Sequence, residues 1–156
     1  MTGEKVLFVC THNSARSQMA EAMLRAWGGE AFEAFSAGSQ ATELRPEAVA
    51  VMGEIGIDIS SQRSKNVGVY EGDRFEWVIT VCDQARRECP VFPGAENSAH
   101  WGIDDPDEVR GDQPARMAAF RAARDELRNR IRFLILTAGR EELGHPAAER
   151  IPEQHA

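Results

Sequence analysis

The residues best suited to do chemistry lie in one short stretch, C-T-H-N-S-A-R-S, which begins at Cys10 and ends at Ser17. Five residues separate the cysteine from Arg16, which is enough chain to fold back over the thiol and point successive backbone N–H groups inward. Such a nest binds a tetrahedral oxyanion, and a guanidinium adds a planar fork for two of its oxygens. We expect the thiol of Cys10, in that positive field, to be ionised and nucleophilic. The residues expected to bind the oxyanion are Thr11, His12, Asn13, Ser14, Ala15, Arg16 and Ser17.

The elements on either side of this stretch must hold it in place. The apolar run from Val6 to Val9 is typical of a buried strand that leads into the loop. Apolar residues at helical spacing from Ala20 to Trp27 predict an amphipathic helix that begins near Ser17 and ends at Gly28. The positive end of this helix would add to the anion site. We expect Ser17 to cap the helix, to donate its hydroxyl to the Cys10 thiolate, or to do both.

The rest of the chain alternates between predicted strands and predicted helices. This order implies βαβ units and an α/β fold in three layers, with a mostly parallel four-stranded sheet flanked by helices. Cys82 ends one strand as Cys10 ends the first, and ligands of such sheets gather at the carboxyl ends of the strands. Residues 1–140 are predicted to form a single catalytic domain, followed by a polar, loosely ordered tail over 141–156. The later strands are expected at 32–37, 76–82 and 98–103, and the later helices from Pro46, over 66–71 and from Asp112.

Length, charge and cysteine usage narrow the class of protein. A chain of 156 residues is long enough for one domain with a substantial core. The net charge of −7 and the lack of a Lys/Arg-rich run argue against nucleic acid as a partner. No apolar run approaches the ~20 residues of a membrane span and no signal peptide is evident, so we expect a cytoplasmic protein. We also expect a monomer without metal or cofactor. Three cysteines in such a chain favour reactive thiols over a structural disulfide framework.

Three sequence features together resemble a known family. They are the stretch C-T-H-N-S-A-R-S-Q-M-A-E-A, the pair Cys82 and Cys89, and the stretch W-G-I-D-D-P. The loop resembles that of the low-molecular-weight tyrosine phosphatase fold, and the similarity runs from about Val6 to about Ile135. The two further cysteines resemble those of the thioredoxin-coupled arsenate reductases built on that fold. The resemblance implies arsenate as a small oxyanion substrate, thioredoxin as the reductant and a role in arsenic detoxification.

The number of cysteines agrees with the electron count of this reaction. Reducing arsenate to arsenite takes two electrons, which thiols supply by forming one disulfide. In the implied relay, Cys10 attacks arsenic, Cys82 attacks Cys10, and Cys89 attacks Cys82 to leave a disulfide that thioredoxin reduces. Cys82 and Cys89 are seven residues apart, so in a regular helix their Cα atoms would lie about 10 Å apart. A disulfide tolerates a Cα–Cα distance of at most about 7 Å. A helix over residues 83–88 is predicted from its residues, and if it is present in the reduced protein it must therefore unwind or loop out on oxidation.

A carboxylic acid is needed to protonate the oxygen that departs as the thiolate attacks. The resemblance implies Asp105, which precedes a proline in an acidic turn, and Asp104 is its adjacent competitor. An ionised thiolate needs no general base. We therefore interpret His12 as part of the loop structure and His100 as a strand residue whose hydrogen bonds are satisfied.

The anion loop is expected to need support from polar side chains. Asn13 suits this role because asparagine tolerates positive φ and bonds neighbouring backbone groups. In relatives, the positions that match Asn13, Glu21 and Ser36 help to form a cation site, which an aspartate completes. Here the matching position is Lys65, whose ammonium is expected to fill that pocket in place of potassium. With Ser17, these are the residues predicted to stabilise the loop.

Two other functions remain open from the sequence. A phosphatase acting on phosphotyrosine or small phosphoesters would need Cys10 and an acid only, which leaves Cys82 and Cys89 incidental. A sensor or buffer could instead bind arsenite or zinc through three thiolates. That protein would need neither the anion loop nor Arg16.

Overall fold

The computed structural model describes residues 3–82, 95 and 97–142. Its centre is a four-stranded sheet in the order β2-β1-β3-β4, in which all neighbouring strands are parallel. The predicted parallel sheet is therefore confirmed. The strands are β1 (Glu4–Cys10), β2 (Phe32–Gly38), β3 (Trp77–Thr80) and β4 (Asn97–His100); the α-helices are α1 (Arg16–Trp27), α2 (Pro46–Glu54) and α4 (Gln113–Glu142); the 3-10 helices are η1 (Gly29–Ala31), η2 (Val67–Tyr70) and η3 (Pro106–Glu108).

The central strand β1 explains why the sheet is parallel and buried. Its residues from Val6 to Val9 have no exposed surface, as expected for a strand covered on both faces. It pairs with β2 through Cys10 opposite Gly38, and with β3 through Val9 opposite Thr80. Because all strands run the same way, the chain leaves β1, β3 and β4 at one edge of the sheet. The loop after Cys10 begins at that edge.

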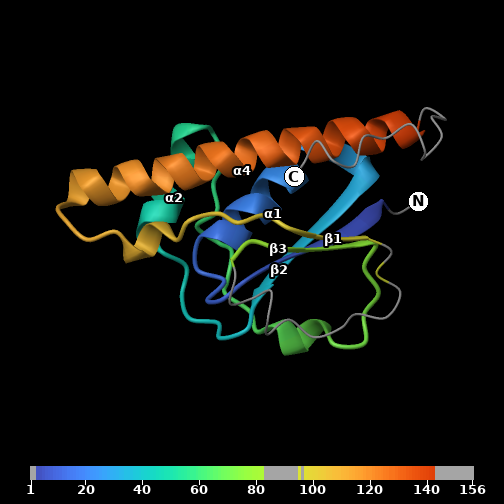
Figure 1. Ribbon diagram of the computed structural model, residues 1–156, viewed down its shortest axis with the longest axis horizontal. Helices are drawn as coiled ribbons and strands as arrows, with labels where there is room; N and C mark the ends of the chain where they lie inside the picture. Colours follow the sequence, from blue (N-terminus) through green and yellow to red (C-terminus); the bar gives the residue numbers. More distant parts are fainter. Residues whose placement is uncertain (1–2, 83–94, 96, 143–156) are drawn as a thin grey trace.

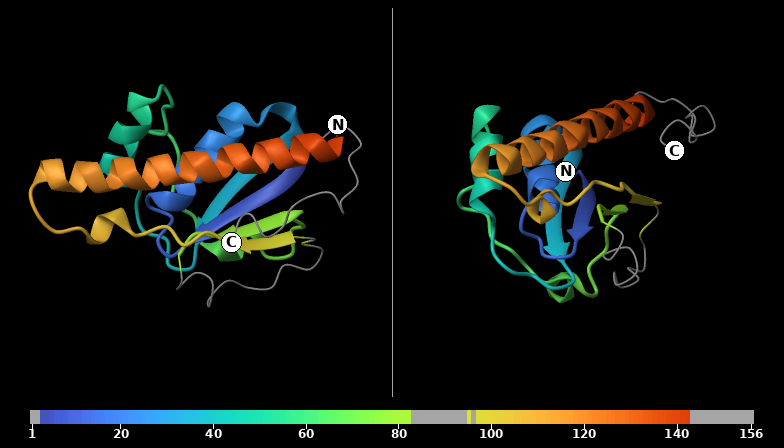
Figure 2. Two further views of the ribbon diagram at one scale, coloured as in Figure 1. Left: turned by 45° about the horizontal axis from the view of Figure 1, so that its top comes forward. Right: turned by 60° about the vertical axis from the view of Figure 1, so that its left-hand side comes forward.

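The helices are arranged in layers relative to the sheet. Helix α1 lies between the sheet and the long helix α4, and η2 lies on the opposite side of the sheet (Figures 1 and 2). None of the helices in the described part of the chain combines the length and the apolar character that crossing a membrane requires.

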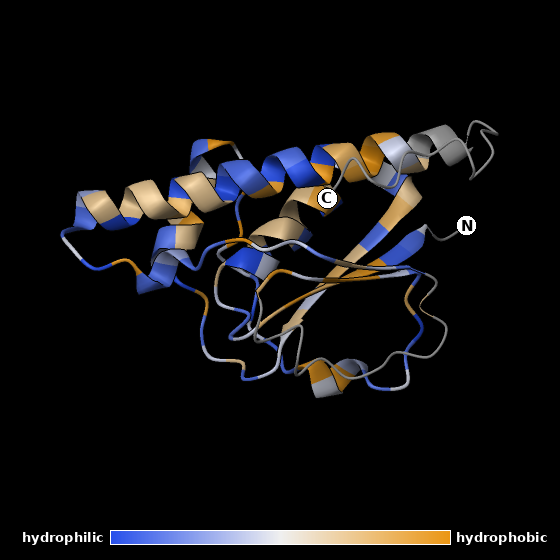
Figure 3. Ribbon diagram, in the orientation of Figure 1, coloured by the Kyte–Doolittle hydropathy of each residue, from blue (hydrophilic) through white to orange (hydrophobic). Residues whose placement is uncertain are grey.

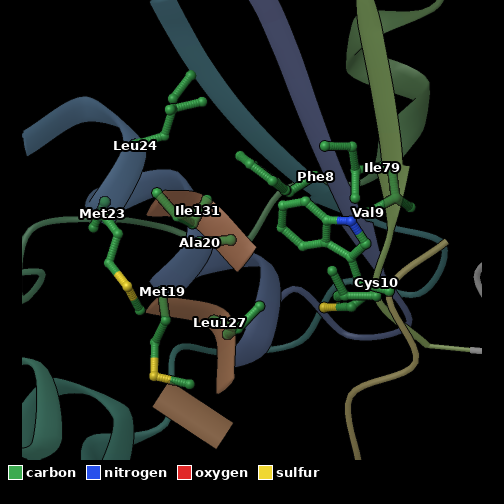
Figure 4. Close-up of a cluster of buried hydrophobic side chains, with 14 of the residues drawn as sticks. Phe8, Val9, Cys10, Met19, Ala20, Met23, Leu24, Ile79, Leu127 and Ile131 are labelled. Atoms are coloured by element: carbon green, nitrogen blue, oxygen red, sulfur yellow. The ribbon is translucent and has the colours of Figure 1, made fainter. Parts of the chain in front are cut away.

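The core sits mainly between β1, α1 and α4. Met19 and Met23 of α1 lie beside Leu127 and Ile131 of α4, while Phe8 projects from β1 (Figure 4). Hydrophilic and hydrophobic residues alternate along α4, which fits a helix with one buried face (Figure 3). The spacing of apolar residues along α4 predicts one buried face, and all its members are buried except Met117, which is partly buried; Arg124 is buried as well. The buried apolar residues of α4 are Phe120, Ala123, Leu127, Ile131 and Leu134.

Some predicted boundaries differ from the observed ones. Strand β3 ends at Thr80, so Cys82 lies two residues beyond the strand instead of at its end, although the Val81 N–H still donates to the Val9 carbonyl at 2.8 Å. Helix α4 continues through Glu142, two residues into the segment predicted as a tail. The rest of that tail and the helix predicted over 83–88 lie outside the described residues.

Candidate active site

The loop between β1 and α1, residues 11–15, is called the anion loop here. Its turn requires a left-handed residue, and Asn13 supplies it with φ of 52°. Asparagine adopts this conformation more readily than most residues because its short side chain bonds nearby backbone groups. The helix then starts at Arg16, and the first N–H groups of an α-helix have no partner within the helix. Those groups, with the positive end of the helix dipole, face the region where Cys10 ends β1.

The side chain of Asn13 links the anion loop to three other segments. Its amide donates to Ser17 Oγ at 2.7 Å and to Ser36 Oγ at 3.0 Å, and its carbonyl oxygen accepts from the Lys65 N–H at 2.8 Å. Asn13 is completely buried, so each of these polar atoms needs its partner. The backbone carbonyl of Asn13 also accepts from Gln18 Nε2 at 2.9 Å and Ser64 Oγ at 2.7 Å; no local pattern in the sequence pointed to either residue.

Cys10 lies at the base of the anion loop and is only 2% exposed. Its sulfur is 2.8 Å from Ser17 Oγ and accepts from the Asn13 N–H at 3.2 Å. Two groups that can donate to a thiolate therefore converge on the sulfur. Ser17 is the second residue of α1, and Ala15 occupies the N-cap position without a side-chain hydrogen bond. Of the two roles considered for Ser17, the N-cap is therefore ruled out, whereas its hydroxyl does lie within hydrogen-bond distance of the Cys10 sulfur.

Arg16 connects the anion loop to the segment that follows β4. Its buried guanidinium donates from Nη1 to the Ile103 carbonyl at 2.8 Å, and Nη2 lies 3.4 Å from Asp105 Oδ2. The neighbouring Asp104 is exposed, so of the two candidate acids it is Asp105 that the fold places against Arg16. An oxyanion gripped by this guanidinium would lie within reach of the Asp105 carboxyl group.

The second cysteine lies beside the same loop. Cys82 is buried, and its sulfur is 3.0 Å from the hydroxyl oxygen of Thr11, the residue next to Cys10. The chain thus brings together two cysteines that are 72 residues apart in sequence (82 − 10). The third predicted cysteine, Cys89, lies outside the described residues.

His12 and His100 are the two histidines interpreted as structural. The side chain of His12 is exposed, and its backbone carbonyl accepts from the Thr42 N–H at 3.0 Å. On β4, His100 Nδ1 is 2.8 Å from the hydroxyl oxygen of Thr80.

A backbone strap after β2, residues 38–45, supports the anion loop from outside. Its N–H groups donate to the backbone carbonyls of Cys10, Thr11, His12 and Ser14 at 2.8–3.2 Å. Gly38 permits this approach, because a Cβ atom there would lie 2.6 Å from the Thr11 carbonyl oxygen and 2.8 Å from the Asn13 nitrogen. Sequence reasoning missed the strap, since main-chain bonds leave no side-chain pattern; Gly38 at a strand end was its only signal. The four donors are the N–H groups of Ser39, Gln40, Thr42 and Arg45.

The predicted loop-stabilising group around Glu21 does come together, with one member that was missed. The Glu21 carboxylate accepts from the Ser36 hydroxyl and pairs with Arg25, which also donates to the Ala34 carbonyl at 2.9 Å. Lys65 Nζ is farther away, 3.9 Å from Glu21 Oε1, and donates to a carbonyl of its own segment. Burial lowers the pKa of Lys65, and the nearby Glu21 opposes that shift. The Glu21–Arg25 spacing of four residues was the overlooked signal.

The comparisons with known proteins agree with this geometry. A family model described as low molecular weight phosphotyrosine protein phosphatase matches residues 5–145. The chain belongs to this family. The predicted family and fold class are thereby confirmed.

Similar members of the family include arsenate reductases. One from Halalkalibacterium halodurans is 39% identical over 132 residues, which are 85% of this chain and 95% of that protein. A solved arsenate reductase in a phosphate-binding state is 33% identical with a TM-score of 0.71, over 86% of this chain and 98% of that one. A thioredoxin-dependent arsenate reductase from Corynebacterium glutamicum is 30% identical with a TM-score of 0.65, over 88% of this chain and 64% of that one.

Proposed function

We propose that the protein reduces arsenate to arsenite and is recycled by thioredoxin. The observation that carries the proposal is the contact between Cys82 and Thr11, which holds a second thiol against the anion loop. Hydrolysis of a phosphoester uses one nucleophile and one acid, and has no need of that thiol. The similarity to arsenate reductases over most of the chain supports the same choice. A cytoplasmic location, where thiols are kept reduced, suits this chemistry.

The first step is attack by Cys10 on bound arsenate. The N–H groups of the anion loop and the guanidinium of Arg16 hold the anion with its arsenic facing the sulfur. A sulfur–arsenic bond forms and an arsenic–oxygen bond breaks. Asp105, against Arg16, gives its proton to the departing oxygen, which leaves as water. Ser17 and the Asn13 N–H stabilise the Cys10 thiolate before the attack.

The next steps move two electrons from the thiols to arsenic. Cys82 attacks the sulfur of Cys10, a disulfide forms, and the sulfur–arsenic bond breaks with its electron pair passing to arsenic. Arsenic falls from the +5 to the +3 state and leaves as arsenite. Cys89 then attacks Cys82 and releases Cys10, and the resulting Cys82–Cys89 disulfide is reduced by thioredoxin.

The test is arsenate-dependent oxidation of reduced thioredoxin by the purified protein. The proposal requires arsenite to appear in step with thioredoxin oxidation. A phosphatase, the second candidate because the family includes that activity, would hydrolyse an aryl phosphate without consuming thioredoxin. A thiol-based sensor would bind arsenite or zinc and turn over neither substrate.

The relay itself predicts a single turnover for Cys89→Ser. With the last thiol removed, the Cys10–Cys82 disulfide cannot be passed on, so about one arsenite per protein should form before the reaction stops. Peptide mass mapping of the stopped protein should find Cys10 joined to Cys82. Sustained thioredoxin-coupled turnover by this variant would show that the relay has another route.

We further propose that Lys65 and Arg25 take the place of a potassium ion near Glu21. The Glu21 carboxylate already interacts with Arg25, Ser36 and Lys65, while the side-chain oxygen of Asn13 accepts from the Lys65 N–H. These oxygens do not fit a potassium site, because their lone pairs already face donors. The two tethered cations neutralise the carboxylate without the cost of binding a free ion.

This proposal predicts that potassium has no specific effect. Activity and melting temperature should be the same within error in potassium and sodium chloride at equal ionic strength, because the cationic side chains already neutralise the Glu21 carboxylate. Lys65→Asp, which removes one cation and adds a carboxylate, should introduce a response to potassium. Specific activation of the unmodified protein by potassium would contradict the substitution.

A further inference from the structure

Four charged side chains anchor the segment that carries Asp105, which is called the acid segment here. These side chains are called the charge clamp and are Arg45, Glu47, Asp107 and Arg116. The carboxylate of Asp107 is shared by two arginines, with Arg116 Nη2 at 2.7 Å and Arg45 Nε at 3.3 Å from the same oxygen. The carboxylate of Glu47, at the start of α2, pairs with the same two arginines: Oε2 lies 3.3 Å from Arg116 Nη2, and Oε1 lies 3.7 Å from Arg45 Nη2. Each arginine therefore lies within ion-pair distance of both Asp107 and Glu47.

The charge clamp contacts both Asp105 and the anion loop. The Asp107 N–H donates to Asp105 Oδ1 at 2.9 Å, so the clamped residue and the predicted acid share one tight turn. The other Asp105 oxygen faces Arg16. On the opposite side, the Arg45 N–H donates to the Ser14 carbonyl at 2.9 Å. One residue thus touches the anion loop with its backbone and the acid segment with its side chain.

Arg116 also fixes the backbone of the acid segment. Its Nη1 donates to the Val109 carbonyl at 2.9 Å and to the Asp107 carbonyl at 3.3 Å, just after η3. The Arg116 side chain is 19% exposed and that of Glu47 is 8% exposed. Water therefore screens the Arg116–Glu47 pair less than it screens ordinary surface ion pairs, whereas the side chains of Arg45 and Asp107 are 38% and 35% exposed. The Arg116 guanidinium thus joins the middle and C-terminal end of η3 to Glu47 of α2.

We propose that Arg45, Asp107 and Arg116 are positioning residues that set where Asp105 stands relative to the anion held by Cys10 and Arg16. The inference rests on the proposed role of Asp105 as the proton donor. General acid catalysis depends on hydrogen-bond reach, and a misplacement of about 1 Å can cost about 10²-fold in rate. Release of the clamp leaves the anion loop intact and lets the acid segment drift. Such a change lowers kcat more than it raises KM.

A purely structural role would look different, and the chain provides a control for it. Arg121, further along α4, makes a two-pronged pair with Glu54 of α2 at 2.9–3.0 Å. That pair joins the same two helices as the charge clamp and touches nothing in the active site. If joining α2 to α4 were all that mattered, Arg121→Gln and Arg116→Gln would have similar effects.

The test is a double-mutant cycle on arsenate reduction, with melting temperatures as a check on folding. Asp107→Asn and Arg116→Gln should each lower kcat about tenfold with KM for arsenate within about twofold, whereas Arg121→Gln should change neither. In an Asp105→Asn background, where the acid is gone, adding Asp107→Asn should cost no more than about twofold further. The coupling appears only if Asp107 acts through Asp105.

Two results would overturn the inference: full kcat in both Asp107→Asn and Arg116→Gln, or an equal loss with and without the Asp105 carboxyl group. Full activity of Asp105→Asn would overturn it as well, by removing the acid on which it rests. A protein that hydrolyses an aryl phosphate but reduces no arsenate would disprove the proposed function alone. The same cycle, measured by hydrolysis, would then still decide the role of the clamp, since that reaction needs the same proton donor.

Discussion

Replacing Cys82 by serine is expected to lower thioredoxin-coupled arsenate reduction by at least about 10³-fold, because a hydroxyl cannot attack the Cys10 sulfur to form a disulfide. The fold should survive the change. Serine is nearly isosteric with cysteine and keeps a donor and acceptor 3.0 Å from the Thr11 hydroxyl. Arsenate should still bind, since none of the groups around Cys10 and Arg16 is altered. Steady-state assays of thioredoxin oxidation measure the loss.

Cys89→Ser is the matched control, since it removes one thiol from the same relay at a later step. Under single-turnover conditions, Cys89→Ser should release about one arsenite per protein and Cys82→Ser almost none. Mass spectrometry should find the Cys10–Cys82 disulfide in stopped Cys89→Ser, and no disulfide between Cys10 and another residue of the chain in Cys82→Ser. Turnover of Cys82→Ser within about tenfold of the unmodified protein would mean that an external thiol resolves the arsenic adduct directly.

Replacing Arg16 by lysine is expected to lower kcat/KM for arsenate by about 10²- to 10³-fold even though the charge is kept. A single ammonium cannot hold two anion oxygens and at the same time donate to the Ile103 carbonyl and face Asp105. The loss should therefore appear in both anion affinity and turnover. Titration with phosphate as a competitive inhibitor separates the two.

The matched control for Arg16→Lys is Arg121→Lys, the same exchange at an exposed ion pair on α4. It should leave kcat/KM within about twofold, because a surface ion pair contributes little to the stability of the fold and this pair lies away from the active site. A full retention of activity in Arg16→Lys would show that charge alone suffices, and that the bidentate geometry of the guanidinium has no catalytic value.

The local parts of the site could be predicted from the sequence by itself. A buried strand, a short loop and a helix N-terminus follow one another without a break, so Cys10, Asn13 and Arg16 had to lie around one point. Backbone conformation at Asn13 follows from local sterics, and its φ of 52° agrees with the predicted left-handed residue. The buried face of α4 could also be predicted, since the spacing of apolar residues along a helix depends only on the sequence of that helix.

The tertiary structure alone decided how distant segments meet at this point. The choice between Asp104 and Asp105 depended on the path of the chain after β4, which turns one carboxylate toward Arg16 and the other toward solvent. Strand β3 stopped short of Cys82 because pairing with β1 and β4 ends at Thr80. The backbone strap over residues 38–45 and the charge clamp left almost no trace in the sequence. Their bonds join residues far apart in the chain, and such pairings depend on where the fold places each backbone rather than on any local pattern.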